Sequence, residues 1–296
     1  MKKYSFLLYS ASFILLTYSC TEDITDELAS SMDKGYPRLV VDGSITSDTT
    51  AHLVRLARTT DYFSNKPLEP ITNAKVTISN GVVVYSLAEN PDKPGDYYTN
   101  PDVYGIPGNT YTLSVSNVDV DKNGEFETYT ASSVMNKMAP VDSISVVNVH
   151  KYFMDLYEIR FNADEPGDTK DFYIFRVKKN GVLLTDTITE MQFTDDQFFN
   201  GIYVENQPVY NLFPDKTDEH LKINDTIMLE TCAVPKEYYD FLIDIMLESR
   251  GSDPFGGQPA NVRTNVEDKS KATGYFLAYD IKRNMTIVSD TIKSKK

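Results

Sequence analysis

Lys75-Val-Thr-Ile-Ser-Asn-Gly-Val-Val-Val-Tyr-Ser-Leu87 is the stretch that decides the fold class of this chain. Polar and apolar residues alternate over the first five positions, which is the two-residue period of a strand with one buried face. Asn80-Gly81 is a dipeptide that favours tight hairpin turns, and the apolar run that follows it provides a returning strand. The stretch therefore predicts an antiparallel hairpin.

Similar short runs, separated by turn residues, continue on both sides of this hairpin. They lie at 38–46, 51–58, 95–99, 110–116 and 125–131. Short strands at such spacing are typical of an antiparallel β-sandwich. The order of these runs also resembles that of extracellular Ig-like and transthyretin-like modules, so we expect a sandwich of that kind over residues 36–138.

The second half of the chain is also rich in strand patterns. Met138-Ala-Pro140 suggests a domain boundary, and alternating runs follow it. They lie at 141–147, 155–161, 171–177, 182–188, 225–232 and 274–279. We expect a mostly β protein with two antiparallel β-sandwich domains, the second one spanning residues 139–296.

One segment of the second half has the period of a helix. Its apolar residues recur at i, i+3, i+4, i+7 and i+8, and they are Tyr238, Phe241, Leu242, Ile245 and Met246. Pro235 suits the first turn, and Gly251 can end the helix. The pattern predicts an amphipathic helix over 236–249 that packs on the second sheet.

The first nineteen residues have the features of a signal peptide. Lys2 and Lys3 precede an apolar stretch that is too short to span a bilayer, and a small residue, Ser19, stands directly before Cys20. This arrangement resembles a bacterial lipobox, in which the cysteine receives a diacylglycerol and the new amine is acylated, for instance with palmitate. We expect Cys20 to be lipidated and residues 20–35 to form a flexible tether. A plain secretory peptide is the alternative.

The composition excludes some classes of partner. The chain has 296 residues and a formal net charge of −14, whereas nucleic-acid binding needs clustered lysines and arginines. Its two cysteines are Cys20 and Cys232. If Cys20 carries lipid, Cys232 has no partner, and its strand-like surroundings predict a buried small hydrophobic residue.

Several stretches together resemble one family. They are Pro37-Arg-Leu-Val-Val-Asp-Gly, Asn73-Ala-Lys-Val-Thr-Ile, Ala139-Pro-Val-Asp-Ser-Ile, Phe193-Thr-Asp-Asp-Gln-Phe-Phe-Asn-Gly201, Asn224-Asp-Thr-Ile-Met-Leu-Glu, Glu237-Tyr-Tyr-Asp-Phe, Asp253-Pro-Phe, Pro259-Ala-Asn-Val and Thr273-Gly-Tyr-Phe. Their order resembles a Bacteroidetes outer-membrane lipoprotein family described as a domain of unknown function (DUF4249). The resemblance covers essentially the whole mature chain. In the family Gly usually precedes Asp-Thr, where this chain has Asn224.

The resemblance implies a place beside TonB-dependent outer-membrane transporters, in the manner of surface nutrient-uptake systems. It brings no catalytic residues to this chain. The acidic residues behind Cys20 resemble the export signal of lipoproteins that face the exterior.

Motifs that carry chemistry are sparse. None of the three histidines has a second one at metal-ligand spacing, and no nucleophile elbow or phosphate loop is present. Asp195-Asp196 has the residue types for glycoside hydrolysis, although such pairs are common in a chain with 43 acidic residues.

One stretch matches the opening of a calcium loop, with Asp119, Asp121 and Asn123 at the ligand positions. Its twelfth position is Thr130 where a glutamate is expected, and a hairpin tip explains the same residues. We therefore expect no metal and no cofactor, with these three residues as the calcium candidate.

The long Pro- and Gly-rich loop at 253–265 supplies the candidate binding residues. They are Phe255, Asn261, Arg263 and Asn265. Long loops of this kind are often functional, and a structural crossover is the alternative. Tyr and Phe pairs are present but Trp is absent, so the composition neither favours nor excludes a glycan ligand.

These observations lead to one expected function and two alternatives. We expect a non-catalytic lipoprotein on the outer face of the outer membrane, which captures an unidentified ligand or assists a TonB-dependent transporter. A secreted hydrolase on β-sandwich domains is one alternative. An adhesin or structural envelope protein is the other.

Overall fold

The hairpin predicted from residues 75–87 is present in the computed structural model, which describes residues 37–59, 67–151, 153–249 and 262–289. Strand β4 (Lys75–Ser79) pairs antiparallel with β5 (Val84–Ser86). The Asn80 side chain accepts hydrogen bonds from the backbone N–H groups of Val82 and Val83, and Gly81 has a φ of 85°. The turn therefore forms for the reason that its sequence suggests.

The first half of the chain contributes nine strands within the described residues. They are β1 (Leu39–Thr46), β2 (Leu53–Arg58), β3 (Glu69–Pro70), β4, β5, β6 (Ala88–Glu89), β7 (Asp96–Tyr98), β8 (Thr110–Val118) and β9 (Glu127–Val134). The four-stranded sheet β5-β4-β8-β9 packs against the strands β1, β2 and β7 of a larger sheet. These two layers form the sandwich predicted for this half.

The second half contributes eight strands and one helix within the described residues. They are β10 (Val141–Lys151), β11 (Met154–Asp164), β12 (Phe172–Lys179), β13 (Val182–Leu183), β14 (Gln192–Asp195), β15 (Tyr203–Leu212), β16 (Thr226–Ala233), α3 (Lys236–Ser249) and β17 (Ala272–Ile287). The three-stranded sheet β10-β11-β15 packs against strands β12 and β16 of the larger sheet. The fold class is therefore mostly β, as predicted, with one helix in the described chain.

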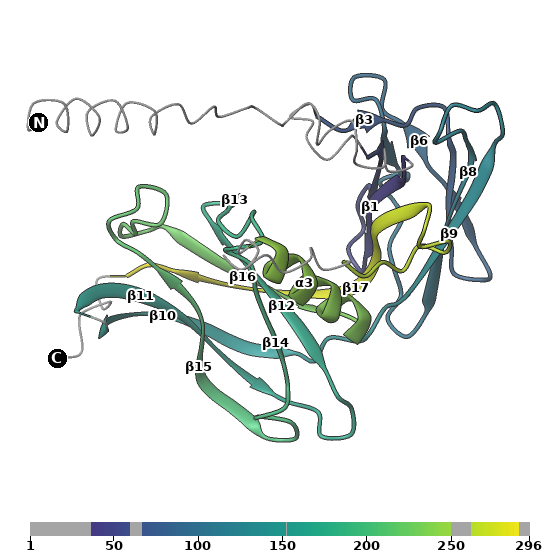
Figure 1. The fold of residues 1–296 in the computed structure, drawn as a ribbon. Coiled ribbons are helices and arrows are strands. Elements are labelled where there is room, and N and C mark those ends of the chain that lie inside the picture. The colour runs from purple at the N-terminus through teal and green to yellow at the C-terminus, as the bar shows by residue number, and fades with distance from the viewer. Residues whose placement is uncertain (1–36, 60–66, 152, 250–261, 290–296) are drawn as a thin grey trace, which may run out of the picture. The chain divides into compact units, whose positions relative to one another are not determined.

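Strand β17 is shared by both halves (Figure 1). Its first eight residues pair parallel with β1, and its last eight pair antiparallel with β16. The large sheet is therefore continuous, in the order β13-β12-β16-β17-β1-β2-β7-β6. The sequence prediction of antiparallel sheets did not include this one parallel pair.

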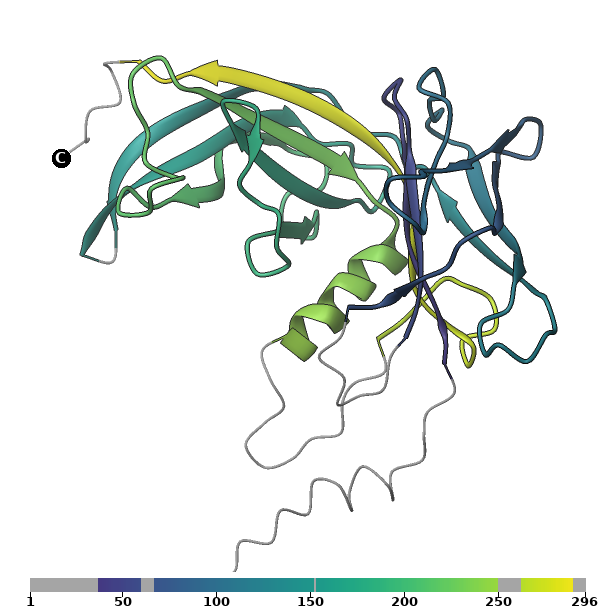
Figure 2. The ribbon, with the colours of Figure 1, turned by 90° about the horizontal axis from the view of Figure 1, so that it is seen from above.

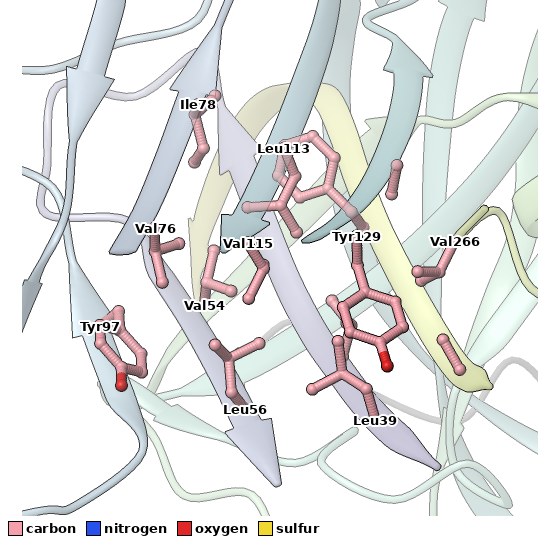
Figure 3. Close-up of a cluster of buried hydrophobic side chains, with 14 of the residues drawn as sticks. Leu39, Val54, Leu56, Val76, Ile78, Tyr97, Leu113, Val115, Tyr129 and Val266 are labelled. Atoms are coloured by element: carbon pink, nitrogen blue, oxygen red, sulfur yellow. The ribbon is translucent and has the colours of Figure 1, made fainter. Parts of the chain in front are cut away.

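The side chains of β17 alternate between two apolar environments. Phe276 and Ala278 join cluster 1, the core between the first two sheet layers, shown in part in Figure 3. Tyr275 and Leu277 lie on the opposite face, under α3, and pack with Phe172, Ile174, Phe241 and Leu242 in a second apolar group that we call cluster 3. The two-residue period of a strand makes this division possible, and it gives the C-terminal segment a place in the core of the first sandwich.

The helix α3 occupies the range that its sequence pattern predicts. Phe241 and Leu242 are buried against Phe172 and Ile174 of β12 and against residues of β16 and β17. Figure 2 shows the helix lying beside the shared sheet. None of the helices in the described part of the chain is both long and apolar enough to cross a membrane.

Candidate functional site

An apolar hollow lined largely by buried and half-buried residues lies between α3 and the shared sheet. It has a volume of about 640 Å³. Its floor comes from β1, β12, β16 and β17, one wall from α3, and the other wall from the segment that follows β13. We call it the α3 cavity. Its size lies in the range of small-molecule sites in proteins.

The apolar part of the α3 cavity is the open side of cluster 3. Tyr238, Ile245, Ile188 and Met191 pack against that cluster and keep part of their surface exposed. The rings of Tyr238 and Tyr275 pack edge to face, with centroids 4.9 Å apart and an angle of 68° between their planes. The wall is therefore apolar, aromatic and supported by packed neighbours.

Polar groups reach the same cavity from the sheet. Arg176 comes from β12, and its Nη1 lies 3.4 Å from the hydroxyl of Tyr279. Arg176 shares a face with Phe172 and Ile174, because all three occupy alternate positions of one strand. An arginine within an apolar strand stripe is the sequence signal that would have located this site.

The thiol of Cys232 also lines the α3 cavity. It is buried, as its sequence context predicted, and burial raises the pKa of the thiol to about 12. Because the thiolate is the nucleophilic form, this cysteine is inert at neutral pH. It acts as a small apolar residue of the floor.

A second candidate is a group of three carboxylates at strand ends. Glu165 follows β11, Asp171 precedes β12 and Asp196 follows β14, and each places an oxygen within 4.8 Å of the others. We call this group the acidic cluster. It is the arrangement of carboxylates in the described chain that has the geometry to hold a metal ion.

Hydrogen bonds already occupy much of the acidic cluster. Asp196 accepts bonds from the backbone N–H of Asp171 and from the amide of Asn200. The hydroxyl group of Tyr173 donates a hydrogen bond to the carboxyl group of Glu165. These contacts tie the strand ends together, so the cluster has a structural role whether or not an ion binds.

Burial dominates the electrostatics of the acidic cluster. Burial and the charges of Asp171 and Asp196 raise the pKa of Glu165 to about 7, against the opposing effect of the bond from Tyr173. Burial also raises the pKa of Asp171. A carboxyl group that titrates near neutrality is able to act as a proton donor or acceptor.

The sequence singles out only Asp196 of the acidic cluster, as half of the Asp195-Asp196 pair. Asp196 is buried in it, but its neighbour Asp195 points elsewhere and lies 3.8 Å from the Lys170 ammonium. Glu165 and Asp171 were missed, because adjacent strand ends meet only in the folded chain. The available signal was that these two acidic residues flank the short connection between β11 and β12.

The candidate binding residues of the long loop fall partly outside the described residues. Phe255 and Asn261 lie there, as does the predicted lipidation site Cys20. Asn265 donates to the backbone carbonyls of Ser132 and Phe276 and accepts from the N–H of Phe276. Both the nitrogen and the oxygen of the Asn265 side-chain amide thus hold this segment against the sandwich.

Arg263, the remaining loop candidate, binds the helix. Its Nη1 lies 2.8 Å from a carboxylate oxygen of Asp240, and its Nε lies 3.2 Å from one of Asp244. Its contacts therefore join the loop to α3, outside the lining of the α3 cavity.

The calcium candidates lie in the exposed turn between β8 and β9. Asp119 accepts hydrogen bonds from the backbone N–H groups of Asn123 and Gly124, and Asn123 accepts one from Glu125. Asp121 accepts a bond from the amide of Asn123. These contacts are those of a hairpin tip, and Thr130 at the twelfth position lies in strand β9.

No curated protein matches the chain. The model of the family described as a domain of unknown function (DUF4249) matches residues 22–284, which is most of the chain. The chain therefore belongs to the DUF4249 family.

Proposed function

We propose that this protein is a lipoprotein of the outer membrane, exposed at the surface, that captures a small ligand for a TonB-dependent nutrient-uptake system. The α3 cavity is the observation that supports capture, because it combines an apolar aromatic wall with a few convergent polar groups. The expected lipid on Cys20 supports the location. A tethered body raises the effective concentration of its ligand near a transporter.

The location is tested with a pair of cysteine variants. Cys20→Ala removes the expected attachment point, and Cys232→Ala serves as the matched control because that thiol is buried in the floor of the α3 cavity. We expect the first variant to leave the membrane fraction and the second to remain there. Mass spectrometry that finds an unacylated mature terminus would contradict the proposal.

The transporter role is tested by co-purification from detergent-solubilised outer membrane. We expect the wild-type protein to bring a TonB-dependent transporter with it in stoichiometric amount. Repeated recovery of the protein alone, under conditions that preserve other transporter complexes, would count against this part of the proposal.

The acidic cluster supports a second candidate, a hydrolase. Glu165 has a raised pKa and Asp171 lines an open surface hollow of about 710 Å³. The test is release of reducing sugar from a polysaccharide panel, with Glu165→Gln as the inactive control. Capture is the better supported function, because the carboxylates of the cluster are held by Tyr173, Asn200 and backbone N–H groups.

A further inference from the structure

The guanidinium of Arg176 has few partners for a side chain that is only 30% exposed. Its contact with the hydroxyl of Tyr279 is long, at 3.4 Å, and its ion pair with Glu230 spans 3.6 Å, beyond a hydrogen bond. An arginine has five N–H donors. Most of those on Arg176 therefore have no acceptor among the described residues.

The buried carboxylate of Glu230 receives its short hydrogen bonds from two other cations. Its Oε1 accepts hydrogen bonds from Lys178 at 2.7 Å and from Arg283 at 2.8 Å. Its Oε2 is buried and has no hydrogen-bond partner in the described chain. Burial opposes ionisation, but the bonds from Lys178 and Arg283 and the charge of Arg176 bring the pKa of Glu230 below its usual value.

The charges around Glu230 do not cancel. Arg283 also forms a two-pronged pair with Asp48, with distances of 2.6 and 2.5 Å. Three positive side chains thus face two carboxylates. The surplus positive charge belongs to Arg176, because it is the cation without a short hydrogen bond to either carboxylate.

The other charged residues of the cavity lie at its rim. Asp42 and Asp186 are exposed, and Asp42 lies 3.7 Å from the guanidinium of Arg55. Water screens exposed charges strongly, whereas a partly buried guanidinium keeps its field. The interior of the cavity is therefore apolar with one positive site.

We propose that the α3 cavity binds an amphipathic organic carboxylate, a small molecule with an aromatic or aliphatic body and a single carboxylate that pairs with Arg176. A planar carboxylate matches the two parallel N–H groups of a guanidinium. The body of the ligand lies against Tyr238, Ile188 and Ile245, and the Tyr279 hydroxyl adds a polar contact. This inference rests on the capture role proposed above and names its ligand class.

The test uses two probes of nearly the same shape, the charged naphthalene-2-carboxylate and the neutral naphthalene-2-carboxamide. Each is titrated into the full mature lipoprotein in detergent, with empty micelles as the baseline. We expect the carboxylate to bind at least about tenfold more tightly than the amide, the range of one charge-assisted hydrogen bond. Arg176→Gln should reduce this preference to about twofold or less.

Arg160→Gln is the matched control variant. Arg160 also pairs with a buried glutamate, Glu158, which keeps a second cation in Lys151 when the arginine is removed. In the same way Glu230 keeps Lys178 and Arg283 in Arg176→Gln. We expect the control variant to retain the wild-type preference for the carboxylate.

Ile188→Trp provides a second variant that does not alter any charge. Ile188 is half-buried in the wall of the cavity, and the larger side chain should obstruct the space where the naphthalene body lies and weaken binding of both probes. Equal affinity for the two probes, an unchanged preference in Arg176→Gln, unchanged binding in Ile188→Trp, or no binding of either probe would each overturn the inference. A protein that binds the carboxylate but brings no transporter would retain the ligand class and lose the transporter role.

Discussion

Glu165 is a carboxyl group that the fold forces to keep its proton near neutral pH. Only 7% of the residue is exposed, and the carboxylates of Asp171 and Asp196 lie within 4.8 Å. Water stabilises an ionised carboxylate better than this site does. Ionisation of Glu165 therefore favours the unfolded chain.

The contribution of Glu165 to the stability of the protein should therefore fall as the pH rises from about 5 to 8. The folded pKa of Glu165 is about 7, above the unfolded value of 4.5. Between these values the folded state holds a proton that the unfolded state has lost, so raising the pH costs stability. One pKa unit corresponds to about 1.4 kcal/mol, so the loss is at most about 3 kcal/mol.

Urea unfolding of Glu165→Gln at pH 5 and pH 8 checks this effect. Glutamine keeps an acceptor for the Tyr173 hydroxyl and cannot ionise. We expect the variant to be more stable than the wild type at pH 8 and similar to it at pH 5. Glu125→Gln, in an exposed turn, is the control and should follow the wild type. A pH dependence in Glu165→Gln equal to that of the wild type would assign the effect to other groups.

At the scale of elements, strands with regular alternation were predictable and irregular ones were not. The runs at 75–79, 110–116 and 225–232 became β4, β8 and β16 with small changes at their ends. Strand β15 was missed because its burial pattern is irregular, its pairing with β11 shifts register twice, and Asn206 has a φ of 51°. Such a strand has no clean two-residue period.

Sequence patterns also say little about which distant segments meet. The run at 182–188 was predicted as a strand, but only Val182–Leu183 pair, and the rest forms a wall of the α3 cavity. In the sequence Arg176 is only one residue of the strand predicted over 171–177. Its role depends on α3 and on that wall, which approach it only in the folded chain.

Strand β17 depends on a glycine where it runs beside β1. Gly274 has a φ of 87°, and a Cβ atom at this position would lie 2.0 Å from the carbonyl oxygen of Val41. Backbone atoms cannot move aside as a flexible side chain does. The glycine in the Thr273-Gly-Tyr-Phe stretch is therefore required by the close approach of two strands.

Gly274→Ala should lower the free energy of unfolding by more than about 3 kcal/mol, because the added atom strains the backbone and disturbs the packing of the core. Gly81→Ala is the matched control, because Gly81 has a φ of 85° but no atom within 4 Å of the added Cβ. We expect about 1 kcal/mol for the control, the cost of a positive φ alone. Similar denaturation midpoints for the two variants would show that β1 and β17 adjust to the extra atom.

For the molecule as a whole, the shared sheet makes the two sandwiches interdependent. Val266, Ala272, Phe276 and Ala278 come from the C-terminal part of the chain and belong to cluster 1. Asp280, which is fully buried, accepts hydrogen bonds from the Ser47 hydroxyl and the Met138 N–H. The boundary predicted between residues 138 and 139 thus divides the chain between β9 and β10. Strand β17 follows this boundary in sequence, but it pairs with β1 of the first half as well as with β16 of the second.

A fragment that ends at residue 138 should therefore fail to fold. It would lose four buried members of cluster 1 and leave all eight residues of β1 without their β17 partner. Val266 and Phe276 each contribute about 1.5–3 kcal/mol and the two alanines less, so the loss reaches the lower end of the total stability of a domain, roughly 5–15 kcal/mol. Amide proton spectra of the fragment should show the narrow dispersion of an unfolded chain, whereas the full chain should unfold in a single urea transition seen by all probes. A well-dispersed fragment spectrum would mean that β1, β2 and β7 suffice for the first sandwich and that β17 is dispensable there.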